Sequence, residues 1–334
     1  MKIQGFLRIV TLLLLFATVA SLVSCGDEET ETPTAVTYTV TFDSKGGSAV
    51  EPKVVPKGEK VPDPGAPVRE GFVFNGWFHD GAKWNFATRA VREDMTLVAQ
   101  WYSAEIIFSY EVDPETQSAK ITKLKERLEE IKIPSVIGGY PVTEIGDGVF
   151  ADLSSANTQS IFIPSSVTAI GAEAFRDTEG VRILFDEDCA LTEIGADAFS
   201  GSTGLTSVPL GEGLEEIAPW CFSDCVALKT VVIPESVTTI CENAFGGCGS
   251  LEWVMMSHTL TSVEDGAFED CDKLQTVYFY GSAQQIDTIL EEKTANMNDA
   301  LLDATVYLYA ETEPAEAGAY GSWYWDENEK IRLW

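Results

Sequence analysis

VTTICENAFGGCGSLEWVMM, residues 237–256, is one copy of a pattern that recurs from Val142 to Ser282. A fixed period in this range is typical of stacked-repeat proteins. One copy cannot bury its own apolar side, so neighbouring copies must cover each other, and the middle of the chain is predicted to form an elongated solenoid. Successive copies lie 25, 24, 23, 23 and 23 residues apart, measured at the slot filled by Phe150, Phe175, Phe199, Phe222, Phe245 and Phe268.

Each copy divides into two halves. Leu228, Val231 and Ile233 have the spacing of a strand whose apolar side chains point inward, and Ile240 and Phe245 point inward from the return half. This pattern resembles the BspA-like leucine-rich repeat family. The resemblance implies a leucine-rich-repeat solenoid, mainly β with short helical turns, that presents a surface for binding. The copies that match closely are 191–213, 214–236, 237–259 and 260–282, and those that match more loosely are 142–166 and 167–190.

The charge of the chain limits its partners. Lys and Arg number 22 and Asp and Glu 53, which gives a formal net charge of −31. Residues 1–24 contain Lys2 and Arg8 and no acidic residue, so their removal leaves a formal net charge of −33. Such a surface repels nucleic acid and anionic lipid headgroups, so neither is an expected partner. Simple solubility of a secreted protein explains the acidity better than a specific cationic ligand does.

The N-terminus reads as an export signal, residues 1–24. Lys2 and Arg8 give the chain a positive start, and the apolar run that follows at residues 9–16 is too short to span a bilayer comfortably. The sequence LVSC that ends at Cys25 resembles the bacterial lipobox, which implies cleavage before Cys25 and acylation of its thiol. The alternative is an ordinary signal peptide with an incidental cysteine. Residues 25–36 are acidic and cannot form a core, so they are expected to be a solvated tether.

Residues 37–101 are predicted to form a small β-rich module before the repeats. Residues 38–42 and 97–101 alternate as half-buried strands do, and 72–78 are aromatic and apolar. The module resembles the internalin B-repeat family, also called the Listeria–Bacteroides repeat, in the ordered set Phe42-Asp43-Ser44, Gly46-Gly47, Arg69-Glu70-Gly71-Phe72, Gly76-Trp77, Trp84-Phe86 and Leu97-Ala99-Trp101. The resemblance implies a β-grasp-like surface module. Its tryptophans are interpreted as core residues rather than as a glycan platform.

Residues 283–334 are expected to cap the C-terminal end of the repeat domain, residues 102–282, because an open solenoid end would expose its core. Ser282 and Gln285 have the spacing of a capping box that opens a helix. One side of that helix holds Ile286, Ile289 and Leu290, and the side chains expected to seal the end are Trp323, Trp325, Leu333 and Trp334. At the other end, residues 106–110 and 119–121 are expected to form a capping hairpin.

Cysteines and histidines give no sign of a metal site or a catalytic centre. Cys225, Cys248 and Cys271 fill one slot of the repeat and are interpreted as a column of buried small residues. The sequence has no Cys-x-x-Cys, and its two histidines, His79 and His258, lie in different predicted domains. It also has no phosphate-binding glycine loop, Gly-x-Ser-x-Gly elbow or His-Glu-x-x-His. No catalytic residue, metal or cofactor is therefore expected.

Strand alternation also predicts which side chains of the repeats face outward. The central outward column reads Phe162, Phe185, Pro209, Val232, Met255 and Tyr278. Aligned large side chains can form a binding patch, and aromatic clusters are where binding energy concentrates. The alternative is that strand propensity alone placed them there. The predicted ligand-binding residues are Trp253, Met255, Tyr278, Tyr280, Val232, Phe185 and Phe162.

Together these features predict a lipid-anchored protein of the bacterial cell surface. Both family resemblances imply non-catalytic, adhesion-type binding of a protein or another cell-surface ligand, and many anchored copies would strengthen weak contacts through avidity. The acidic cluster after Cys25 resembles the surface-export signal of some outer-membrane lipoproteins, which implies the outer membrane. A glycan-binding lipoprotein and a structural spacer without a ligand are the alternatives.

Overall fold

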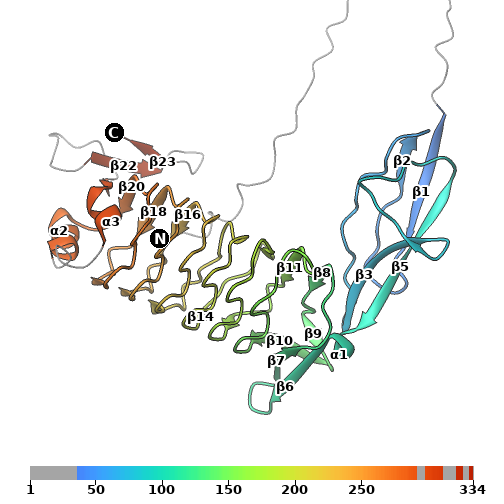
Figure 1. Cartoon of the computed structure of the whole chain (residues 1–334), viewed down its shortest axis with the longest axis horizontal. Helices are drawn as coiled ribbons and strands as arrows, with labels where there is room; N and C mark the ends of the chain where they lie inside the picture. The colour runs from blue at the N-terminus through green and yellow to red at the C-terminus, as the bar shows by residue number, and fades with distance from the viewer. Residues whose placement is uncertain (1–35, 292–297, 311–320, 326–330, 334) are drawn as a thin grey trace, which may run out of the picture. The chain divides into compact units, whose positions relative to one another are not determined.

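The computed structural model of the chain describes residues 36–291, 298–310, 321–325 and 331–333, and they belong to two compact units. Of the described residues, the first unit contains 36–69 and Phe74–Trp101, and the second contains Glu70–Val73 and those from Tyr102 onward. In both units strands dominate, and the helices are few and short (Figure 1). The predicted signal peptide and Cys25 lie outside the described residues.

The first unit is a five-stranded sheet in the order β2-β1-β5-β3-β4. β1 pairs with β2 in antiparallel and with β5 in parallel orientation. The three predicted strand segments of this module are confirmed, because each lies within β1, β3 or β5. The bounds are β1 Thr37–Asp43, β2 Lys53–Pro56, β3 Phe72–His79, β4 Ala82–Lys83 and β5 Met95–Ser103.

The tryptophans of the first unit belong to its core. Trp77 and Trp84 are 2% and 8% exposed, and Trp101 packs against the same cluster. The indole N–H of Trp77 donates to the carbonyl oxygen of Gly65 at 3.1 Å. A Cβ at Gly47 would lie 2.6 Å from the Trp101 ring, so glycine leaves the room that this ring fills. The interpretation of these tryptophans as core residues is confirmed.

The second unit begins with the predicted capping hairpin. β6 Phe108–Asp113 and β7 Ser118–Leu124 pair antiparallel, and β7 then pairs parallel with β10 Tyr140–Ile145, the first return strand of the repeats. The first predicted strand, residues 106–110, was wrong only at its first two residues, which belong to one helical turn, α1 Ala104–Ile107. Phe108 is fully buried with its ring 6.4 Å from Phe150, so the hairpin covers the N-terminal end of the core.

The coils of the repeat contribute strands to two parallel ladders, which enclose the core between them (Figure 1). We call them the front and back ladders. The front ladder contains β8 Glu130–Lys132, β11 Ser160–Ile163, β13 Arg182–Phe185, β16 Thr230–Val232, β18 Trp253–Met256 and β20 Thr276–Phe279. The back ladder contains β10, with β9 Val136–Ile137 beside it, and β12 Ala169–Ile170, β14 Glu193–Ile194, β15 Glu216–Ile217, β17 Thr239–Ile240 and β19 Ser262–Val263.

The six phenylalanines of the repeat form one continuous stack through the core. All six are 0% exposed. Their ring centroids lie 5.1, 5.1, 5.5, 5.3 and 5.3 Å apart along the stack, and the rings are within 17° of parallel. Equivalent slots in consecutive coils therefore face the same way, which confirms the predicted solenoid and its register.

Each coil turns a tight corner around its phenylalanine through two residues with positive φ. The slot two residues before the phenylalanine holds Gly148, Glu173, Asp197, Trp220, Asn243 and Gly266, and the slot two residues after it holds Asp152, Asp177, Gly201, Asp224, Gly247 and Asp270. Left-handed backbone favours glycine and, among the others, asparagine and aspartate. These three residue types fill ten of the twelve positions, and Glu173 and Trp220 fill the other two.

Both ladders are interrupted at the same coil interface. The front ladder stops at β13 and resumes at β16, and the back ladder stops at β14 and resumes at β15. A strand was expected around Pro209, but a proline cannot donate to a ladder. Its carbonyl oxygen instead accepts a bond from the N–H of Leu191 at 3.0 Å. Between coils 191–213 and 214–236, the phenylalanine stack and the hydrogen bonds of the corners stay in register, such as that from the Phe199 N–H to the Cys221 carbonyl oxygen at 2.8 Å.

The C-terminal end is closed by a helix and three added strands. Ser282 N donates to Gln285 Oε1 at 2.9 Å and Gln285 N donates to Ser282 Oγ at 3.3 Å, which confirms the capping box at the start of α2 Ala283–Glu291. Ile286 and Ile289 are buried, as predicted. The remaining elements are α3 Asp299–Asp303 and the strands β21 Thr305–Tyr309, β22 Gly321–Trp325 and β23 Ile331–Leu333, which extend the front ladder past β20.

The predicted sealing residues have different outcomes. Trp323 is fully buried, but its ring contacts are with Tyr278, Tyr280 and Tyr309, so its role in sealing the end of the stack stays a prediction. Leu333 is 50% exposed, so its predicted sealing role was wrong; it stands on β23, the last strand of the sheet, which has a neighbour on one side only. The side chain of Trp325 and the whole of Trp334 lie outside the described residues.

Candidate binding surface

The outward side of the C-terminal front strands carries a dense group of aromatic side chains. Strand register places Met255 between Val232 and Tyr278, and Tyr278 beside Tyr307. Residues that alternate with these, such as Val254 and Val277, are buried, so the group points outward from the core. We call this group the aromatic face, defined as Trp253, Met255, Tyr278, Tyr280, Tyr307 and Tyr309.

Ring contacts hold the aromatic face together. Trp253 meets Tyr278 edge-on with centroids 5.8 Å apart, and Tyr278 stacks on Tyr307 at 6.0 Å. Beside them, Tyr280, Tyr309 and the buried Trp323 contact one another at 4.8 to 5.1 Å. Such contacts fix the side-chain rotamers, so less conformational entropy is lost when a partner binds.

Met255 was predicted on the exposed surface, and this prediction was wrong. Its exposed fraction is only 3%. The residue does face outward by strand alternation, but Trp253 precedes it on its own strand and Tyr278 lies opposite it on the next. The rings of these two residues meet beside it and cover the flexible thioether. Met255 therefore supports the aromatic face from below instead of offering contact area.

Phe185 was predicted in the central outward column, and the register of the strands contradicts this. Phe162 pairs with Leu184, and Phe185 pairs with the buried Ile163. The cause is one missing residue, since Val181 and Ile183 are two positions apart where other copies have three. Phe185 accordingly packs against the core, with its ring 6.3 Å from Phe199. Leu184, which is 39% exposed, takes the outward position.

Phe162 and Val232 lie on opposite sides of the ladder interruption. Phe162 is half-buried on β11, where Lys132 Nζ lies 5.1 Å from its ring centroid. Val232 is half-buried on β16, next to the aromatic face in register. The structure therefore brings Val232, Trp253, Tyr278 and Tyr280 together and leaves Phe162 apart. The predicted continuous column is divided at the coil that contains Pro209.

The chemistry of the aromatic face suits binding. Burial, and after it the neighbouring Tyr307, raises the pKa of Tyr278, so its phenol stays protonated at neutral pH. The face thus offers apolar rings together with neutral hydroxyl groups. This combination is enriched at protein interfaces.

The sequence did not reveal a row of hydrogen bonds beside the phenylalanine stack. The thiols of Cys225, Cys248 and Cys271 are buried, as predicted, and each donates at 3.1 Å to the carbonyl oxygen of the phenylalanine one coil earlier. Ser202 Oγ occupies the same slot and donates to the carbonyl oxygen of Phe175 at 2.8 Å. In these four consecutive copies the slot therefore holds a small residue that can donate, and the serine among the cysteines was the available signal.

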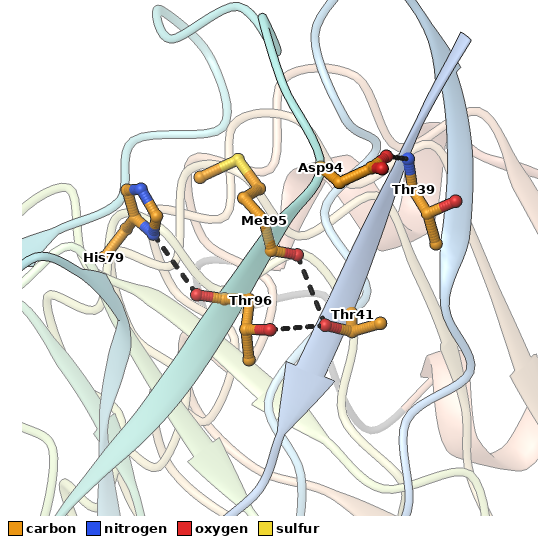
Figure 2. Close-up of a pocket in the computed structure, with 6 residues that line it drawn as sticks. All are labelled: Thr39, Thr41, His79, Asp94, Met95 and Thr96. Carbon is orange, nitrogen blue, oxygen red and sulfur yellow. Dashed lines mark hydrogen bonds between the residues drawn. The ribbon is translucent and has the colours of Figure 1, made fainter.

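The first unit has a shallow pocket of about 410 Å³ lined by Thr39, Thr41, His79, Asp94, Met95 and Thr96 (Figure 2). Its polar groups largely bind each other. Asp94 Oδ1 accepts from the Thr39 N–H at 2.7 Å, and the hydroxyls of Thr41 and Thr96 lie 2.7 Å apart. His79 Nδ1 lies 3.3 Å from the carbonyl oxygen of Thr96. Because these groups already have partners, the pocket is a weaker candidate than the aromatic face.

The described residues contain neither a membrane-spanning helix nor a cluster of metal ligands. None of the helices in residues 36–291, 298–310, 321–325 and 331–333 is long and apolar enough to cross a bilayer. The same residues contain no group of three or more histidine, cysteine, aspartate or glutamate side chains placed to hold a metal ion.

Two family profiles match the chain. The BspA type leucine rich repeat region matches residues 122–190 and 182–297, with six copies, and so covers more than half of the chain. The Listeria-Bacteroides repeat domain matches residues 38–100.

The chain also resembles individual proteins over part of their length. Internalin H of Listeria monocytogenes is 33% identical over 115 residues, which is 33% of this chain and 20% of Internalin H. A protein of Evansella cellulosilytica whose name describes it as a membrane protein is 39% identical over 79 residues, 23% of this chain and 12% of that protein. The chain therefore spans a fifth or less of these relatives. Among solved structures, the T. pallidum leucine-rich repeat protein TpLRR has 25% identity and a TM-score of 0.44, over 56% of this chain and 91% of that one.

Proposed function

Because the chain belongs to the BspA-type leucine-rich repeat family, we propose that it binds a protein partner at the bacterial cell surface and catalyses no reaction. The partner contacts the aromatic face, and a lipid on Cys25 anchors the chain to the outer membrane. One observation carries the proposal: Trp253, Tyr278 and Tyr280 are half-buried neighbours on or beside adjacent front strands, and ring contacts hold them in one group.

Tyrosine and tryptophan are the residues that most often dominate the binding energy of protein interfaces. Adjacent parallel strands lie about 4.8 Å apart, so β18, β20 and β21 present Trp253, Tyr278 and Tyr307 as one surface. Val232 continues that surface at its edge. A rigid surface of this composition resembles the preorganised centre of an interface, around which weaker polar contacts exclude water.

A protein suits this face better than a sugar does. Sugar platforms need an open ring face, but the Tyr278 ring is stacked on Tyr307 at 6.0 Å and meets Trp253 on another side. The Tyr278 ring is therefore engaged within the chain, and the face as a whole combines apolar rings with hydroxyl groups, which suits the mixed apolar and polar surface of a protein.

The proposed lipid anchor on Cys25 is supported by the sequence. The proposed chain order is a signal peptide, a tether at residues 25–36, a spacer module at 37–101, the repeat domain at 102–282 and its cap at 283–334. The resemblance of residues 22–25 to a lipobox supports acylation of Cys25. Labelling cells with a fatty-acid analogue tests this directly, because Cys25→Ser should lose the label and Cys271→Ser should keep it. Equal labelling of both variants would contradict the lipid anchor.

Capture of partners by the immobilised chain tests the binding face. Residues 25–334 with Cys25→Ser are coupled to beads, and proteins captured from host cell surfaces are quantified by mass spectrometry. We expect a partner that is lost when Trp253→Ala and Tyr278→Ala are combined. Removal of two interface anchors commonly costs about 2 kcal/mol each, which weakens binding more than a hundredfold.

Leu184→Ser is the matched control. Leu184 is also an exposed apolar residue of the front ladder, but it stands on β13, beyond the interruption. The control variant should capture the partner as the unaltered chain does. Unchanged capture by the double variant would refute the face, and capture of no protein at all would favour the spacer alternative. Loss of capture after enzymatic deglycosylation of the host proteins would favour a glycan ligand.

A further inference from the structure

Trp220 occupies a backbone position that does not suit tryptophan. Its φ is +59°, in the corner slot two residues before Phe222. The same slot holds glycine, aspartate or asparagine in four of the other five copies, residues that tolerate left-handed backbone far better than a bulky aromatic does. The indole is therefore held in place against a local conformational preference.

The fold makes little use of this side chain. Trp220 is 41% exposed, and the described residues give its indole no ring contact and no hydrogen bond. Each of the other tryptophan side chains that the structure describes has such a contact, among them Trp77, Trp84 and Trp253. The corner of every coil requires positive φ at this slot, so the unusual feature is a bulky aromatic at a position where the fold favours a small residue.

Polar groups flank the indole on both neighbouring coils. The backbone N–H of Asp197 donates to the carbonyl oxygen of Pro219 at 3.1 Å, and that of Trp220 donates to Glu242 at 3.0 Å. These bonds place Asp197 and Asn243 in the same slot, one coil before and one coil after Trp220. Both are partly exposed, and Asn243 Nδ2 lies 3.3 Å from Glu242 Oε1. The Asp197 carboxylate and the Asn243 amide therefore occupy the slot of the indole on the two neighbouring coils.

The nearby charge is partly neutralised within the chain. Arg176 pairs with Glu173, the residue in this slot one coil before Asp197. Burial is the main cause that raises the pKa of Asp197, and Arg176 acts against it. Carboxylates accept hydrogen bonds from sugar hydroxyls as well as from cationic side chains, and the comparison below with a lysine-rich peptide distinguishes the two ligands.

We propose that the corner formed by Asp197, Trp220 and Asn243 binds the ring of a neutral sugar. A pyranose has an apolar C–H face that stacks on an indole and a rim of hydroxyl groups that both donate and accept. Trp220 supplies the platform, Asp197 accepts from a hydroxyl, and the Asn243 amide donates to another. This site lies away from the aromatic face along the coil and does not depend on the proposed function.

Indole NMR on the folded chain tests the site. Residues 25–334 with Cys25→Ser and ¹⁵N-labelled tryptophan are titrated separately with lactose, cellotetraose and triacetylchitotriose. The Trp220 cross-peak is assigned by its absence from Trp220→Gly, a variant that accepts positive φ without strain. We expect at least one sugar to shift this cross-peak saturably. Trp220→Gly should weaken that sugar's binding at least about tenfold, measured by calorimetry, and Trp253→Ala should leave it within about twofold.

Three results would overturn the proposal. The first is that none of the sugars shifts the Trp220 cross-peak, and the second is that Trp220→Gly binds the sugar as tightly as the unaltered chain does. The third is a cross-peak shifted only by a lysine-rich peptide added as a comparison, which would assign the corner to a cationic side chain. Trp220→Asn provides a second variant with a residue suited to the slot and should lose the sugar in the same way.

Discussion

Replacing Phe245 by alanine probes the register of the coils. The ring is fully buried and stacks on Phe222 and on Phe268, each with a centroid distance of 5.3 Å. Deleting a buried phenylalanine side chain costs about 3–5 kcal/mol because a cavity is left behind. Each stacked pair adds roughly 0.5–1.5 kcal/mol beyond its buried area. We therefore expect Phe245→Ala to lower the free energy of unfolding by at least about 4 kcal/mol.

The matched control is Phe162→Ala. Phe162 is also a phenylalanine of the repeat domain, but it is half-buried and faces outward from β11. Its loss should cost about 1 kcal/mol or less, because little of the ring leaves a packed environment. Urea unfolding followed by circular dichroism measures both variants, and the slope of the transition shows whether unfolding stays cooperative.

The comparison is decisive because both variants delete the same side chain. A difference of at least about 2 kcal/mol in the expected direction supports the stack. Equal losses for the two variants would refute the stacked register, since Phe245 would then be no more buried than Phe162. A solenoid couples each coil only to its neighbours, so Phe245→Ala should also weaken the two interfaces on either side of its coil.

Three other consequences are testable. Native-state hydrogen exchange should show the coils before and after the ladder interruption opening as separate units, and one common opening step for all coils would contradict this. Cys248→Val should be less stable than Cys248→Ser by about 0.5–1.5 kcal/mol, because serine still donates to the Phe222 carbonyl oxygen, whereas valine leaves it only the bond from the Cys225 N–H at 3.2 Å; equal urea midpoints for the two variants would contradict the role of the side-chain bond. Burial raises the pKa of the Cys271 thiol from 9.0 to about 12, so the unfolded chain loses this proton at lower pH than the folded chain does. The free energy of unfolding should therefore fall as pH rises from 9 to 12, by about 1.4 kcal/mol per unit of pKa difference. Cys271→Ser should make this pH dependence shallower, and an unchanged pH dependence would contradict the burial of the thiol.

The solenoid and its core could be predicted because one residue type recurs at a nearly fixed period. Phe150 to Phe268 had to face the same way for any coil to bury its apolar side, and they do. The capping hairpin, the capping box at Ser282 and the tryptophan core of the first unit followed from local patterns in the same way. These features depend on short-range spacing, which the sequence displays directly.

The candidate surface was harder to predict because it depends on spacing between coils. One residue fewer before β13 moved Phe185 from the outward side to the core. Pro209 removed a ladder strand, which divided the expected column. Met255 does point outward, but its burial depends on the rings of two neighbouring strands. The positive φ of Trp220 is a property of the corner backbone, and only the aligned slots of the six coils reveal it.

Photo-crosslinking from the surface of living cells tests the binding face most directly. A photoreactive phenylalanine analogue is placed at position 253 in one variant of the anchored chain and at position 184 in another, and the cells are irradiated in contact with host cells. We expect a covalent adduct with a host protein from position 253 and none from position 184. Adducts of equal yield from both positions, or from position 184 alone, would contradict the claim that the C-terminal aromatic face holds the partner.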